Sequence, residues 1–216
     1  MFIGHFGVAL AAKKLTPRTS LGALFFAAQF LDLLWPILLL AGREHVRIAP
    51  GITRMSPFDF YDYPITHSLL MAAFWSVAVG SGYYLLRRNG RAAWIIGLAV
   101  LSHWVLDFLV HRPDLPLWPG SPKVGLGLWN SWMLEILLEV AIFLIGCWLY
   151  FSVTRPRDNI GRYALWALLV FLFAAWVVSL ASGPPPNERS LAWAALSMWI
   201  FIPWAWWADR HRDAIM

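Results

Sequence analysis

Charged residues are scarce in this sequence, where Asp, Glu, Lys and Arg together make up only 13% of 216 residues. Soluble domains carry about 25% of such residues, so this shortage excludes an ordinary water-soluble fold. Hydrophobic residues make up 60% of the chain, and its mean hydropathy is +0.60. The composition therefore predicts an integral membrane protein.

Cysteine is also nearly absent. Cys147 is the single cysteine, which excludes an intramolecular disulfide and leaves the redox compartment open. The first apolar stretch has no basic residues in front of it, because Lys13 and Lys14 come after it. A secretory signal peptide has the opposite order, with its basic residues first. We therefore expect this first stretch to belong to the mature protein.

Long basic runs are missing too, although the formal net charge is +5. The Lys and Arg residues lie in short clusters between apolar runs, which is typical of loops that set the orientation of a membrane protein. The pattern does not favour a nucleic-acid surface. We expect membrane lipid and no nucleic acid as partners, and the oligomeric state stays open.

Six apolar stretches are long enough to cross a bilayer, whose core about 30 Å thick needs roughly 20 residues per helix. They cover residues 21–41, 65–86, 91–110, 131–153, 163–182 and 191–207. We predict an all-α polytopic bundle of about six transmembrane helices, with a short membrane-inserted helix over residues 2–15. The chain then forms one domain over residues 1–216, in which residues 121–216 add further transmembrane helices.

The basic residues divide unevenly between the two sides of the membrane. With loops assigned alternately, eleven of the 17 Lys and Arg residues fall on the side that holds residues 16–20. Cytoplasmic loops carry the excess of Lys and Arg. We therefore predict that the N-terminus and the C-terminus both lie in the cytoplasm.

Ionisable residues inside the apolar stretches are rare, and each is costly in lipid unless it has a partner. His103, Asp107 and His111 follow at steps of four residues, which places them along one face of a helix. Imidazole nitrogen and carboxylate oxygen both bind zinc and related ions. A local hydrogen bond between His103 and Asp107 that stabilises a buried helix explains the pattern equally well.

The depth of four residues strengthens the metal hypothesis. If residues 16–20 form a turn at the membrane surface, His5 and Asp32 each lie about 20 Å from it at 1.5 Å per residue. His103 and Asp107 lie about 18 and 24 Å from the same surface. The four side chains are thus expected to converge in the outer half of the membrane. The alternative for His5 is an ordinary interfacial position near the chain terminus.

Further polar residues lie near the outer ends of the predicted spans. His67 follows Pro64 and Thr66, and Thr66 is placed to cap the helix or to orient the imidazole. Glu135 and Glu139 form another pair at a spacing of four, suited to a general base, a supporting partner or a ligand. A plain helix contact fits them equally. We interpret the remaining outer-loop charges as solvated; these are Asp59, Asp62, Arg112 and Asp114.

Several of these residues belong to a series of short motifs. In chain order they are Gly4-His5, Asp32 before Trp35-Pro36, Thr66-His67-Ser68-Leu69, Ser102-His103-x-x-x-Asp107 and the loop Leu115-Pro116-Leu117-Trp118-Pro119. Together they resemble the LexA-regulated, membrane-bound, metal-dependent hydrolase family of bacterial inner membranes, over residues 1–120. The resemblance implies a helical inner-membrane protein whose His and Asp residues bind a divalent metal.

The resemblance also carries over site residues by position. The matching positions are His5, Asp32, Thr66, His67, His103 and Asp107. The chain departs from the family pattern at Leu34, where a second acidic residue is common, and at Asp62-Tyr63-Pro64, where His-Arg-Gly is common. Both departures remove ligands. A single ion is therefore expected, held by His5, Asp32, His67, His103 and Asp107.

The function that follows is a membrane-embedded metal-dependent hydrolase, with zinc as the expected ion. We expect Asp107, Asp32 or Glu135 to accept the proton of the activated water, and Thr66 to belong to the catalytic residues. A site in the outer half of the membrane favours a lipid-borne substrate such as a phospholipid or a polyprenyl phosphoester. Two alternatives stay open, namely an ion or small-solute transporter that uses the His and Asp cluster, and a metal-stabilised scaffold without turnover.

Overall fold

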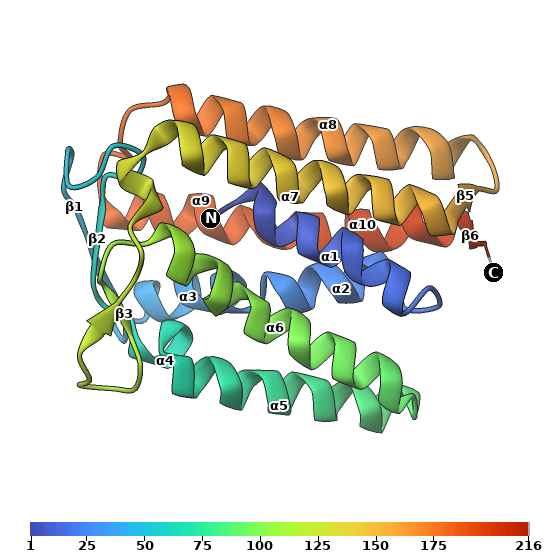
Figure 1. Ribbon diagram of the computed structural model, residues 1–216, viewed down its shortest axis with the longest axis horizontal. Coiled ribbons are helices and arrows are strands. Elements are labelled where there is room, and N and C mark those ends of the chain that lie inside the picture. The colour runs from blue at the N-terminus through green and yellow to red at the C-terminus, as the bar shows by residue number, and fades with distance from the viewer. Residues whose placement is uncertain (216) are drawn as a thin grey trace.

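The computed structural model describes residues 1–215, and within them helices dominate (Figure 1). Five helical stretches are long and apolar enough to cross a membrane. They are α5 (Leu69–Arg87), α6 (Gly90–Val110), α7 (Trp132–Val153), α8 (Asn159–Ala181) and the run of α9 (Glu188–Leu196), η2 (Ser197–Ile200) and α10 (Phe201–Arg210). The predicted helical membrane fold is therefore confirmed; residue 216 of the expected domain lies outside the described residues.

A sixth candidate span is broken near its middle. α2 (Leu21–Ala28) and α3 (Phe30–Leu40) meet at Gln29 with a bend of 55°. The spans thus number five, or six if this bent pair crosses as one, where the sequence predicts about six. The break ends α2 at Ala28, and the last carbonyl groups of a helix have no partner within it. The Ala28 carbonyl is thereby free to accept a hydrogen bond from another helix.

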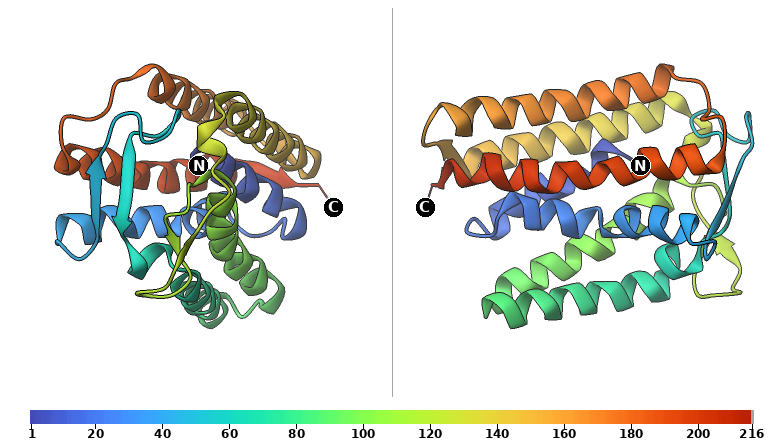
Figure 2. Two further views of the ribbon diagram at one scale, coloured as in Figure 1. Left: turned by 60° about the vertical axis from the view of Figure 1, so that its left-hand side comes forward. Right: turned by 180° about the vertical axis from the view of Figure 1, so that it is seen from behind.

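The short helix expected at the start of the chain is α1 (Ile3–Leu15), which lies inside the bundle against α7 and α2 (Figure 2). Two glycines let α1 and α7 approach closely. A Cβ added at Gly7 would lie 2.6 Å from the carbonyl oxygen of Ile142, and one added at Gly146 would collide with the Gly7 carbonyl. Small residues at such contacts are common between transmembrane helices.

The second span begins later than the sequence predicts. A single turn, α4 (Pro64–His67), precedes α5, and Ser68 between them has an extended backbone at φ −78° and ψ 147°. The Ser68 hydroxyl accepts a hydrogen bond from the Met71 amide and caps α5. His67 therefore lies on a separate turn, whose direction differs from that of α5.

Three short antiparallel strand pairs were not predicted from the sequence. The pair of β1 (His45–Ile48) and β2 (Phe58–Asp62) covers one end of the bundle, as Figure 2 shows. β3 (Leu115–Pro116) pairs with β4 (Lys123–Val124) within one loop, and β5 (Thr154–Pro156) pairs with the distant β6 (Arg212–Ala214) at the other end of the bundle (Figure 1). The connections between helices are thus partly ordered by strand pairing.

The two ends of the described chain lie at different levels of the bundle. Met1 is inside, with its amino group 3.1 Å from Asp107 Oδ1. β6 lies at the end of the bundle where α1 turns into α2 (Figure 1). Met1 thus lies inside the bundle, because α1 runs from this turn into it. That both termini are on the cytoplasmic side stays a prediction.

A buried ion pair joins α1 to α10 near that turn. Lys13 Nζ donates to Asp209 Oδ2 at 2.6 Å and to the Thr19 carbonyl at 2.8 Å. Asp209 also accepts from the Tyr150 hydroxyl at 2.6 Å and from the Leu21 amide at 2.9 Å. Every polar atom of this pair thus faces a partner, as a buried charge requires.

We expect Asp209→Asn to lower the free energy of unfolding by about 3 kcal/mol, because Lys13 would keep a buried charge without its counter-ion. Unfolding of the purified variant in one fixed detergent measures the effect. Lys13→Met combined with Asp209→Asn leaves no lone charge, and should be less destabilised than Asp209→Asn alone. Equal stability of the single and double variants would show that the ion pair does not matter.

Candidate metal centre

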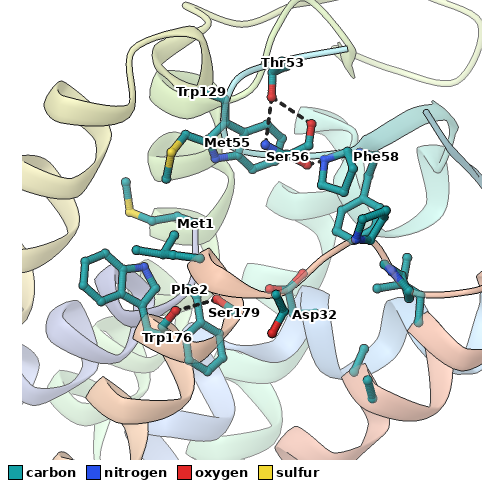
Figure 3. A pocket seen from close by; sticks show the side chains of 18 of the residues that line it. Met1, Phe2, Asp32, Thr53, Met55, Ser56, Phe58, Trp129, Trp176 and Ser179 are labelled. Carbon is teal, nitrogen blue, oxygen red and sulfur yellow. Dashed lines mark hydrogen bonds between the residues drawn. The ribbon is translucent and has the colours of Figure 1, made fainter. Parts of the chain in front are cut away.

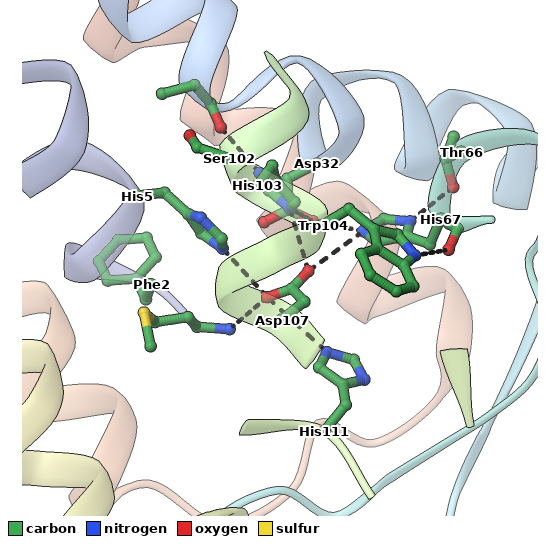
Figure 4. A network of polar contacts seen from close by, with 12 residues as sticks. Phe2, His5, Asp32, Thr66, His67, Ser102, His103, Trp104, Asp107 and His111 are labelled. Atoms are coloured by element: carbon green, nitrogen blue, oxygen red, sulfur yellow. Dashed lines mark hydrogen bonds and ion pairs between the residues drawn. The ribbon is translucent and has the colours of Figure 1, made fainter. Parts of the chain in front are cut away.

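Two imidazoles and two carboxylates from three helices meet in the interior of the bundle (Figure 4). His103 Nε2, on α6, lies 3.2 Å from Asp107 Oδ2 and 3.5 Å from Asp32 Oδ1 on α3. His67 Nε2, on α4, lies 3.4 Å from Asp32 Oδ1 and 3.7 Å from Asp107 Oδ2. We call these four residues the metal centre. The structure thus brings together side chains that are up to 75 residues apart in the chain.

The hydrogen bonds of His103 determine which ring nitrogen carries the proton. Its Nδ1 lies 2.8 Å from the carbonyl oxygen of Ala28, which can only accept. Nδ1 is therefore protonated, and in the neutral imidazole Nε2 presents a lone pair to the two carboxylates. Nε2 is buried and makes no hydrogen bond to a described residue. A lone pair directed at anionic oxygens in a buried site is the arrangement that a cation stabilises.

His67 is held in the same tautomer by a different route. The Thr66 hydroxyl donates to Glu44 Oε2 at 2.7 Å, so Thr66 Oγ1 accepts from His67 Nδ1, also at 2.7 Å. In the neutral imidazole, His67 Nε2 therefore also presents a lone pair to the carboxylates. Thr66 is fully buried and does not line the cavity described below. Its contacts orient His67, and they do not reach the space where a substrate would lie.

Glu44 is a part of the site that the sequence did not reveal. Besides the Thr66 hydroxyl, it accepts from the amides of Ile65 and Thr66 at 2.7 and 2.8 Å, and it is completely buried. Burial raises the pKa of its carboxyl above the usual value, while the hydrogen bonds from Thr66 act in the opposite direction. In the sequence, Glu44 looks like any other charged residue in a loop that follows an apolar stretch.

His111 extends the site towards the outer loops. Its Nδ1 lies 2.9 Å from Asp114 Oδ1, and its Nε2 lies 3.9 Å from Asp107 Oδ1. The Tyr63 hydroxyl donates to Asp114 Oδ1 at 3.2 Å, and burial raises the pKa of Tyr63 well above its usual value. Tyr63 thus stays a neutral donor.

The interpretation of the outer-loop charges as solvated is wrong for Asp114, which is only 2% exposed. The loop after α6 folds back over the bundle and buries it. Arg112 bridges Asp114 and Asp59, with its Nε 3.3 Å from Asp114 Oδ2. Asp62 pairs with His45 at 2.9 Å and remains partly exposed.

His5 reaches the same place from α1, but its ring cannot share an ion with His103. The two rings are stacked, with centroids 3.7 Å apart and planes inclined by 2°. Ring nitrogens bind zinc in the ring plane at about 2.1 Å, and two parallel planes this far apart do not converge on one ion. His5 Nε2 instead lies 3.2 Å from Asp107 Oδ1 and forms a hydrogen bond with it.

The two glutamates of α7 have separate environments. Glu139 accepts from the amides of Phe2 and Gly4 at 3.0 and 2.9 Å, and so anchors the start of α1 to α7. Glu135 is 1% exposed, and its Oε2 has no hydrogen-bond partner among the described residues. An unpartnered buried carboxylate oxygen is costly unless a ligand or water contacts it.

A cavity of about 920 Å³ connects these groups (Figure 3). Its polar wall includes Asp32, His67, Asp107, His111 and Glu135. His5 and His103 lie behind this wall, since they are buried and do not line the cavity. A molecule in the cavity therefore meets both carboxylates of the metal centre and Glu135.

Comparison with known proteins places the chain in a family. No curated protein and no solved structure matches it. A family model described as YdjM inner membrane protein matches residues 1–185, well beyond the 120 residues that carry the motifs. The match takes in α7 and α8, and with them Glu135 and Glu139. The description names a location and no reaction. This chain belongs to the YdjM inner membrane protein family and is an integral membrane protein.

Proposed function

We propose that this chain is a membrane-embedded hydrolase that depends on a divalent metal ion. The observation that supports the proposal most is the orientation of His67 and His103, whose Nε2 atoms face carboxylate oxygens at 3.2 to 3.7 Å. With neutral imidazoles this arrangement is repulsive in a buried site unless a metal cation lies between the groups. The fixed Nδ1 partners of both rings are those expected of metal-binding histidines.

The residues that would hold the ion are the four of the metal centre, Asp32, His67, His103 and Asp107. Two nitrogen and two oxygen ligands suit zinc. The ligand atoms of His5, His103 and Asp107 lie close together, as do those of Asp32, His67 and His103, and both groups contain His103. A neutral His103 has one free lone pair and would serve one ion, so we keep the expectation of a single ion, held by the second group with Asp107. His5 would then orient Asp107 instead of binding the metal.

A bound ion of this kind supplies a water molecule of lowered pKa and polarises the scissile bond. Glu135 is the best-placed proton acceptor, because it lines the same cavity as the metal centre and its Oε2 has no hydrogen-bond partner among the described residues. Asp107 already accepts from His5 and lies near His103, so it positions the site. The substrate is a phosphoester or another ester carried by a lipid, since the site lies within the helical bundle.

We expect Glu135→Gln to lower kcat by at least about 100-fold, the usual contribution of a general base, with its metal content unchanged. Hydrolysis of phospholipids and of small phosphodiesters by protein in nanodiscs, together with metal analysis, measures both quantities. The matched control is Glu188→Gln at the start of α9, outside the cavity, which should behave like the unaltered protein. Undiminished turnover in Glu135→Gln would remove Glu135 from the mechanism.

The two alternatives make different predictions. A transporter needs a continuous polar path, but Phe6, Leu10 and Phe25, which are fully buried apolar side chains, pack in the core between the metal centre and the Lys13–Asp209 pair. Metal-dependent ion flux into liposomes would favour the transporter. A scaffold would bind metal with the same residues and hydrolyse none of the esters.

A further inference from the structure

The cavity has a second, apolar region away from the metal centre. It continues as a groove between α8 and the run of α9, η2 and α10. Side chains from both walls line it: Ala175, Trp176, Leu191, Ala195, Met198 and Phe201. In Figure 3, Trp176 and Asp32 border the same space. The apolar groove thus ends at the polar residues of the metal centre.

The groove opens on the outer surface of the bundle. Phe171 and Val178 both line the cavity, and they are 51% and 62% exposed. The two walls of the groove pack against different helices: α8 packs against α10, whereas α9 packs against α3. In a membrane the outside of this bundle faces lipid. A hydrocarbon chain can therefore pass from the bilayer into the groove without crossing water.

Another part of the cavity rim is formed by the loop between β1 and β2. Pro50, Gly51 and Arg54 line the cavity here and are exposed. Among the described residues that line it, Arg54 is the only Lys or Arg. No ion pair joins Arg54 to another described residue in the structure. Its guanidinium is thus available to an anionic group at the polar end of the cavity.

We propose that the groove holds the hydrocarbon chain of an anionic lipid phosphoester, whose phosphate lies between the metal centre and Arg54. This inference rests on the proposed hydrolase function and names its substrate class. The three parts of the cavity match the three parts of such a molecule in order: an apolar groove open to lipid, a metal centre, and a cationic rim open to water. Ala175 and Ala195 are the positions where a larger side chain would shorten the groove.

The test uses alkyl 4-nitrophenyl phosphodiesters with methyl, propyl, pentyl and heptyl chains, and the full-length protein in nanodiscs. The esters with short chains dissolve in water. The rise in kcat/KM per added methylene therefore measures how many methylenes the groove removes from water. We expect kcat/KM to rise about fourfold for each added methylene until the groove is full. Ala175→Trp fills the groove and should reduce the rise to less than about twofold per methylene.

The control is Ala174→Trp, because Ala174 is exposed on the same helix and does not line the cavity. It should keep the chain-length dependence of the unaltered protein. The measured quantity is a ratio between esters, so it does not depend on how much of each variant is folded. Turnover that depends on His103 but not on chain length would overturn the groove inference and leave the hydrolase proposal intact.

A binding experiment keeps the inference testable if no ester is hydrolysed, which would overturn the proposed function alone. Calorimetric titration with inorganic phosphate and with n-alkyl phosphates should show affinity rising with chain length in the unaltered protein and not in Ala175→Trp. Arg54→Gln should weaken all members by a similar factor, about tenfold. Equal affinity for inorganic phosphate and heptyl phosphate would overturn the groove, and unchanged affinity in Arg54→Gln would overturn the role of Arg54.

Discussion

His103→Ala is expected to lose both bound metal and turnover. The substitution removes an imidazole that lies within 3.5 Å of both Asp32 and Asp107, and it leaves His67 as the single imidazole among the four residues of the centre. Removing a partner that only supports a ligand already costs 10- to 100-fold in metal affinity, so loss of a ligand should cost at least about 100-fold. Metal content of the purified protein and hydrolysis of phosphodiesters measure the two effects.

Two other histidines serve as comparisons. His5→Ala should keep the ion, because His5 bonds to Asp107 and its ring stacks on His103. His211→Ala, whose side chain pairs with Asp158 at the far end of the bundle, should keep both metal and activity. A His103→Ala protein that retains its metal would contradict the metal centre, and equal metal loss in His5→Ala would contradict the role given to His5.

Gly146→Ala is expected to destabilise the protein by about 3 kcal/mol and to reduce turnover together with stability. The added methyl group would collide with the carbonyl of Gly7, where α1 and α7 touch through their backbones. Backbone atoms cannot move aside as a flexible side chain can, so α1 must shift. His5 and the amides bound by Glu139 would move with it. Unfolding in a fixed detergent and activity at low temperature measure the two consequences.

Gly82→Ala provides a matched control, for which the expected change in the free energy of unfolding has the opposite sign. Gly82 lies inside α5, and apart from neighbouring atoms of its own helix no atom lies within 4 Å of the added methyl group. Alanine is favoured over glycine in a helix interior by about 1 kcal/mol, so this variant should be unchanged or slightly more stable. Similar stability of the Gly146→Ala and Gly82→Ala proteins would show that the close approach of α1 and α7 is not important.

Helix geometry explains why part of the site was predictable. A constant rise of 1.5 Å per residue converts distance along the chain into depth in the bundle. The sequence therefore predicts that His5 and Asp32 lie at the same depth as His103 and Asp107. The structure places these residues in contact. The shared depth required no knowledge of the loops, only of where each apolar stretch begins.

The roles of individual residues were less predictable, because they depend on the direction in which each side chain points. The spacing of residues along the sequence does not give that direction. His5 and His103 are equivalent by depth, yet the stacking of their rings separates a ligand from a supporting residue. The sequence predicts a solvated Asp114 and gives no signal for Glu44, and only the folding of loops over the bundle buries them. The catalytic role expected of Thr66 stays a prediction; its hydrogen bonds connect Glu44 to His67.

The sequence by itself determined the membrane class, the approximate spans and the level at which ionisable residues gather, because these follow from hydrophobicity and helix rise along single segments. Tertiary structure decided how residues 121–215 complete the cavity. It places Glu135, a candidate from the sequence, in the cavity wall, and α8 to α10 supply the walls of the apolar groove. Such features arise where helices distant in sequence face one another, and the direction in which an apolar helix turns its side chains is set by packing with its neighbours.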